Sequence, residues 1–256
     1  MSRRSRSAQA LAASAAASVV AVALGGWGGG APRAATGSLP AARIVTLSKA
    51  ALSGERTLAL AGTIRHGTAA VAIKLESGRN GAVSRGVLDS NSKSVGFLGP
   101  LAYVAIGKTL YVHAAGLFWQ QFVTPGSGLT APQAAKIIKA LSARWIVLGP
   151  AYAKTLTSAL GALTNPRSVA SAVLANGGSV SKRRPTKVRG VLALPIVSGG
   201  GGTLYVALHG PPLPIEVSGS GGGSSGTVVF TYPKSVHITA PRGARTLAAV
   251  TKSVVG

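Results

Sequence analysis

Side chains that could act as acids, bases or metal ligands are few in this chain of 256 residues. Catalysis by paired carboxylates, by a Ser-His-Asp triad or by a bound metal requires several such groups close together. No two acidic residues lie nearer in sequence than Glu76 and Asp89, and no two histidines have the spacing of metal ligands. We therefore predict no catalytic residues, no metal site and no cofactor, and we do not expect an enzyme. The full set consists of Glu55, Glu76, Asp89, Glu216, His66, His113, His209 and His237.

One short motif, Gly107-Lys108-Thr109, is similar to the end of a phosphate-binding loop. That loop needs another glycine five residues before Gly107, where this chain has Ala102, and it needs a helix afterwards. The residues that follow, 110–112, continue an alternating strand pattern instead. The motif therefore does not predict nucleotide binding.

Basic residues far outnumber acidic ones, with 27 Lys and Arg against 4 Asp and Glu and a net charge of +23. Because charged residues make up only 12% of the chain, the imbalance comes more from missing acids than from added bases. Two explanations remain open. The charge attracts an anionic partner, or the protein works at low pH, where protonated carboxylates contribute little.

The densest basic run lies at 182–189. It has no interleaved aromatic residues, so it does not predict a nucleic-acid site. A solvated edge before a strand is one interpretation, and attraction to anionic lipid headgroups is another. The candidates for an anionic-surface contact are Lys182, Arg183, Arg184, Lys187 and Arg189.

The N-terminus has the pattern of a secretory signal: Arg3, Arg4 and Arg6 precede an Ala/Val/Leu-rich run from Ala8 to Leu24. Leu24-Gly25-Gly26 then resembles a bacterial lipobox, but Trp27 stands where the lipid-bearing cysteine belongs. The chain has no cysteine, so a thioether-linked anchor and disulfides are both excluded. We expect residues 1–36 to be a signal segment and tether, 37–256 to form a single domain, and the protein to be exported to the cell envelope or the medium.

Periodicity predicts helices and strands in separate blocks. Helices are expected from Ala41 to Gly54, after a capping box at Thr130 and Gln133, along the stripe from Tyr152 to Leu163, and after Asn165-Pro166. Strands are expected at 71–76, 82–88, 94–98, 101–106, 109–114, 117–123, 187–197, 203–209, 213–218, 226–232 and 235–239. This order predicts an α+β fold, in which helices cover the concave face of one large curved antiparallel sheet.

Several short segments resemble mycobacterial-type cell-envelope lipoproteins of the LppX/LprG type, which share the half-barrel of the LolA-like lipoprotein carriers. They are the near-lipobox 24–26, the strand segment 110–113 leading to Phe118-Trp119, the tryptophan segment 143–147, and 188–190, 204–206 and 210–215, with Pro241 after the last strand. The resemblance covers about 40–250. It implies a curved sheet around helices that encloses an apolar pocket for acyl chains of a lipid or glycolipid, with no catalytic residues.

The mean hydropathy of +0.37 is high, yet no apolar run after residue 40 approaches the ~20 residues of a membrane span. The apolar excess therefore belongs to a packed core or to an aliphatic cavity. The candidates for a lipid pocket are Val71, Ile73, Ile137, Ile138, Leu141, Leu156, Leu160, Leu204 and Val206. We expect a monomeric extracytoplasmic lipid carrier. The alternative is a ligand-free structural or interaction module of the envelope, whose basic surface binds anionic polymer or membrane.

Overall fold

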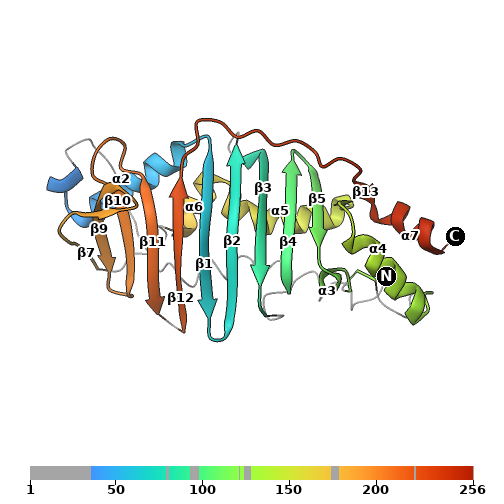
Figure 1. The fold of residues 1–256 in the computed structure, drawn as a ribbon. Coiled ribbons are helices and arrows are strands. Elements are labelled where there is room, and N and C mark those ends of the chain that lie inside the picture. Colours follow the sequence, from blue (N-terminus) through green and yellow to red (C-terminus); the bar gives the residue numbers. More distant parts are fainter. Residues whose placement is uncertain are drawn as a thin grey trace.

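The protein is described here from a computed structural model. The described residues are 36–78, 81–92, 98–120, 122–123, 128–173, 179–221 and 223–255. Within them, one broad sheet forms a layer, with helices α2, α5 and α6 behind it in the view of Figure 1. We call this the helix-covered face of the sheet and the opposite side the open face.

The described strands form one 13-stranded sheet, in the order β13-β6-β5-β4-β3-β2-β1-β12-β11-β10-β9-β7, with β8 paired to β9. Every pairing is antiparallel except β13 with β6. The strands are β1 (Leu58–His66), β2 (Ala69–Gly78), β3 (Val83–Ser90), β4 (Gly99–Ile106), β5 (Thr109–Ala114), β6 (Ile146–Val147), β7 (Val180–Lys182), β8 (Thr186–Val188), β9 (Val191–Ser198), β10 (Gly202–Ala207), β11 (Pro214–Gly221), β12 (Ser224–Thr231) and β13 (Arg245–Thr246).

Strand β1 joins the two halves of the sheet, because it pairs with β2 on one side and with β12 on the other. Side chains alternate between the two faces along each strand. In β2, for example, Val71, Ile73 and Leu75 are buried under the helices, whereas Ala72 and Lys74 are exposed. At the centre of the sheet, none of the described helices covers the open face (Figure 1).

The helices begin and end at recognisable signals. In α4 (Ala131–Ser142) both halves of the capping box form, and Thr130 Oγ1 accepts from the Gln133 backbone N–H at 3.4 Å. Asn165 Oδ1 accepts from the Arg167 N–H at 2.9 Å ahead of α6 (Pro166–Val173). The other elements are the short 3₁₀ turn η1 (Thr36–Ser38), α2 (Ala41–Gly54), α3 (Gly116–Trp119), α5 (Pro150–Thr164) and α7 (Leu247–Val255). Helix α2 packs on α6, and α4 packs on α7.

The predicted fold class is confirmed: the protein is α+β, with a large, mostly antiparallel sheet. Two predicted strands are wrong. Residues 117–123 begin with α3 because Phe118, Trp119 and Phe122 gather into an aromatic cluster instead of alternating across a sheet. Residues 235–239 form no strand, since the chain between Pro233 and Pro241 runs along the end of the sheet without a pairing partner (Figure 1).

Other boundaries shift. Strand β10 ends at Ala207, before His209, and the stretch 187–197 divides at Arg189, which has φ 49°. The expected strand 94–98 lies outside the described residues except for its last position. Strands β1, β6, β7 and β13 and helix α7 were not expected from the periodicity. Strand β1 is rich in small residues, the other three strands are short, and the apolar residues of α7 follow directly on β13.

Candidate functional site

An aliphatic layer lies between the sheet and the helices. The sheet contributes residues such as Leu60 and Phe230, which are register partners across β1 and β12. Helix α2 contributes Ile44 and Leu52, both fully buried. Burial of this much aliphatic surface is the main stabilising contribution to the fold, at roughly 25 cal/mol per Å².

The nine predicted pocket residues all belong to this layer, but they are spread along it: α4 packs near β5, whereas β10 lies seven strands away in the sheet. Ile138 and Leu156 are partly exposed and pack against its margin. The fully buried members are Val71, Ile73, Ile137, Leu141, Leu160, Leu204 and Val206. All nine thus belong to one extended hydrophobic cluster, and the structure does not gather them at a single point.

Among the described residues, two buried hydroxyl groups in the helix-covered layer have no hydrogen-bond partner: Ser48 Oγ on α2 and Tyr103 Oη on β4. Both side chains are almost completely buried. Burial raises the pKa of the Tyr103 phenol. Ser84 opposes this rise slightly, although no bond of ordinary geometry joins the two hydroxyls. Sequence reasoning missed both residues, because a serine in a helix and a tyrosine in a strand are ordinary at such positions.

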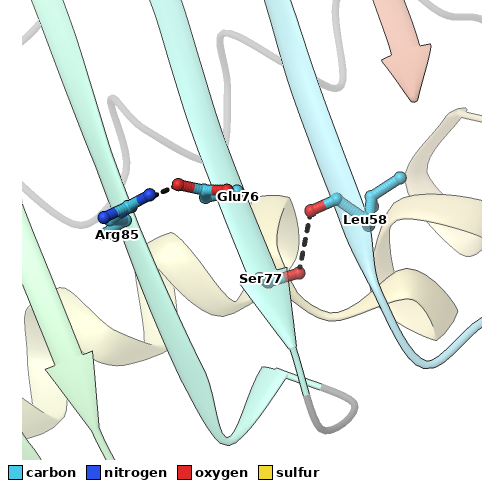
Figure 2. Close-up of polar contacts among 4 residues, drawn as sticks. All are labelled: Leu58, Glu76, Ser77 and Arg85. Carbon is cyan, nitrogen blue, oxygen red and sulfur yellow. Dashed lines mark hydrogen bonds and ion pairs between the residues drawn. The ribbon is translucent and has the colours of Figure 1, made fainter. Parts of the chain in front are cut away.

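The open face carries an apolar hollow of about 760 Å³ over β1 to β4. Its floor includes Ala61, Lys74, Val87 and Ala102, which are successive register partners across these four strands. Trp145, which comes just before β6, also lines it. At its edge Arg85 and Glu76 form an ion pair between β3 and β2 (Figure 2).

Figure 2 also shows that Glu76 and Ser77, neighbours in β2, make contacts with different partners. Glu76 belongs to the ion pair and lines the open-face hollow, whereas Ser77 is buried and donates to the Leu58 carbonyl at 3.4 Å. That bond ties β2 to β1 at the end of their ladder, where Leu58 and Ser77 are register partners. Strands β1 and β2, which lie under the hollow, are therefore joined by their backbone ladder and by this side-chain bond.

A second hollow of about 850 Å³ adjoins the first on the open face, sharing Ala61 and Val229 with it. Its lining is mainly polar and comes from β1, β12, β11 and β10, together with Arg189. The side chains that enter it are chiefly hydroxyls and two guanidinium groups. They are Thr63, Arg65, Arg189, Thr203, Ser218, Ser220, Ser225 and Thr227.

The five basic candidates at 182–189 are all exposed, but they do not act alike. Lys182 Nζ donates to the carbonyls of Gly37 at 2.9 Å and Leu39 at 3.1 Å, so it holds the N-terminal turn in place. Arg189 Nε donates to Glu216 Oε2 at 2.9 Å and reaches the polar hollow. The run is therefore divided between a structural contact and the open face.

The histidines occupy separate places. His113 lies in β5, with its ring centroid 5.7 Å from that of Trp145, and His66 Nδ1 is 2.7 Å from Ser224 Oγ. Within the described part of the chain, no group of three His, Cys, Asp or Glu side chains could hold a metal ion. Nor does any described helix combine the length and apolarity needed to cross a membrane.

Comparison with known proteins gives matches of fold only. No family model and no curated protein matches the chain. Among solved structures, lipoprotein LppX of Mycobacterium tuberculosis matches with 13% identity and a TM-score of 0.44, covering 75% of this chain and 94% of that one. LprF of Mycobacterium bovis matches with 11% identity and a TM-score of 0.48, covering 78% and 96%. An uncharacterized conserved protein of Thermus thermophilus matches with 10% identity and a TM-score of 0.35, covering 79% and 95%.

LppX is a lipoprotein and gives its name to the type that the sequence segments resemble. At these identities and scores no residue role carries over from the matched structures.

Proposed function

We propose that this protein is an extracytoplasmic carrier that holds the acyl chains of a lipid or glycolipid between its sheet and its helices. The observation that carries the proposal is the aliphatic layer with two buried, unpaired hydroxyls, Ser48 and Tyr103. A buried hydroxyl without a partner costs roughly 1–3 kcal/mol, and native proteins contain few of them. The ester or hydroxyl oxygen of a bound lipid would supply the missing partner.

The composition of the layer suits such a ligand. Its members are overwhelmingly aliphatic, and burying each methylene group of an acyl chain against them is favourable by ~0.8 kcal/mol. The residues that would contact acyl chains are the nine pocket candidates, which belong to β2, β10, α4 and α5. Ile138 and Leu156, at the margin of the layer, mark where a lipid would enter.

The test removes one atom from the layer. Tyr103→Phe deletes only the unpaired hydroxyl, so a ligand-free core should keep or slightly gain stability. A carrier should instead lose bound lipid, measured by mass spectrometry of organic extracts from the purified protein. Tyr111→Phe, on the open face of β5, is the matched control and should leave the extract unchanged.

Either of two outcomes counts against the carrier. One is an extract of the native protein that contains no lipid after purification without detergent. The other is equal lipid content in Tyr103→Phe and native protein, which would show that the phenol contacts no ligand.

A further inference from the structure

Four hydroxyl-bearing side chains form a straight row across the open face. Thr63 of β1 is the register partner of Thr227 in β12, Thr227 of Ser218 in β11, and Ser218 of Thr203 in β10. Since neighbouring strands lie about 4.8 Å apart, the row spans about 14 Å. A shorter second row, two residues further along the strands, consists of Arg65, Ser225 and Ser220.

The row forms the floor of the polar hollow, and its hydroxyls are available to hydrogen-bond a ligand. None of the four makes a hydrogen bond to another described residue, and all four are only partly exposed. Each hydroxyl can donate one hydrogen bond and accept others. Strand propensity alone explains a threonine on a solvated sheet face, but it does not explain a recess of about 850 Å³ above an aligned row.

Two arginines give the hollow its charge preference. Arg65 has no ion-pair partner among the described residues, and it stands beside the row in the next register position. Arg189 uses Nε to bind Glu216, which leaves its two terminal nitrogens free to donate. A guanidinium group pairs with a planar carboxylate through two parallel hydrogen bonds. The field around the hollow favours anions as well, because the chain carries a net charge of +23.

From these observations we infer that the polar hollow of the open face binds an acidic polysaccharide, with its sugar hydroxyls on the threonine and serine row and its carboxylates on Arg65 and Arg189. The linear row suits an extended polymer better than a compact anion. The lining has no aromatic side chain on which a nucleobase would stack. It also has no large apolar side chain that would insert into a membrane. This site lies on the opposite face of the sheet from the proposed acyl site and does not depend on it.

The experiment measures binding of polygalacturonate oligomers by isothermal titration calorimetry, with neutral dextran as the reference polymer. Native protein should bind polygalacturonate and not dextran, and the affinity should fall with salt, since exposed charges are screened. Arg65→Gln should weaken binding about tenfold, the usual size of a lost charge-assisted hydrogen bond. Thr227→Val should also weaken it, with the charge unchanged. Arg184→Gln is the matched control: it removes the same charge from the basic run but lies outside the hollow, so it should have less than a twofold effect.

Three outcomes would overturn the inference. Native protein that does not bind polygalacturonate at low salt removes it outright. Equal losses for Arg65→Gln and Arg184→Gln would mean that net charge alone attracts the polymer. Tighter binding to anionic phospholipid vesicles, with the same dependence on Arg65 and Thr227, would make the hollow a membrane contact. The melting temperature of each variant should equal that of native protein, so that lost binding does not reflect unfolding. Its lipid extract should also equal that of native protein, which separates this site from the acyl site.

Discussion

Gly62 and Gly226 set how closely β1 approaches β12. A methyl group at Gly62 would collide with the carbonyl oxygen of Thr227, and one at Gly226 would lie 2.7 Å from the carbonyl oxygen of Thr63. Both obstacles are backbone atoms of a paired strand, so they cannot rotate away. Glycine at these two positions therefore permits the close pairing that aligns Thr63 with Thr227.

We expect Gly226→Ala to lower the free energy of unfolding by about 1–3 kcal/mol, the usual cost of forcing an extra carbon into a packed region. Chemical denaturation measures the change. Gly54→Ala is the control, because a methyl group at Gly54 would meet nothing within 4 Å, and its stability should stay the same or rise slightly. Equal stability of the two variants would show that β1 and β12 can separate without cost.

At the scale of the element, local signals predicted the structure well where they were strong. The capping box at Thr130, the Asn165-Pro166 start and the alternation of Val71, Ile73 and Leu75 each depend only on nearby residues. Strand β1 lacked such a signal, because Gly62 and small alanines interrupt its pattern. Its place is decided by two partners, one of which lies far along the chain in β12.

The same reason hid the hydroxyl row. Thr63, Thr203, Ser218 and Thr227 are unremarkable polar positions when each strand is considered alone. They become a row only in the order β1-β12-β11-β10, in which β1 neighbours a strand more than 150 residues later. The pocket candidates were easier to find, since aliphatic periodicity selects buried residues directly. Whether they line a cavity depends on packing between elements, which periodicity does not record.

Helix α5 offers the sharpest test of that packing. Leu160 is buried on α5, which contacts β2, β5 and α6. In a carrier, Leu160→Trp should fill space that a lipid occupies, so lipid uptake should fall while the melting temperature changes little. In a close-packed core the same ring should cost ~1–3 kcal/mol in strain. Leu160→Met, which nearly conserves volume, is the control and should change neither quantity by much. Destabilisation of Leu160→Trp without any lipid in the native protein would contradict the proposed carrier.

At the scale of the whole molecule, the two faces of the sheet divide the chemistry. Apolar side chains gather under the helices, whereas both ion pairs found among the described residues lie on or beside the open face. Glu76 and Glu216, two of the four acids, thus pair with arginines, and most basic side chains among the described residues have no ion-pair partner. This division would let one sheet offer the proposed acyl site on one side and the proposed anion-binding site on the other.

The predicted export signal at the N-terminus can be tested directly. If residues 1–36 are a signal and tether, protein isolated from its native host should be outside the cytoplasm and lack Met1, and N-terminal sequencing measures this. The described fold begins at Thr36, and Lys182 anchors the turn that follows it, so removal of the preceding residues should leave the melting temperature unchanged.

Trp27 provides no thiol, so labelling with a radioactive fatty acid should find no covalently attached lipid. Trp27→Cys should restore attachment if 24–27 is a degenerate lipobox, whereas Trp27→Ser, which also provides no thiol, should not. Recovery of Met1 from the exported protein would contradict the signal assignment, and labelling of the Ser variant would contradict the lipobox.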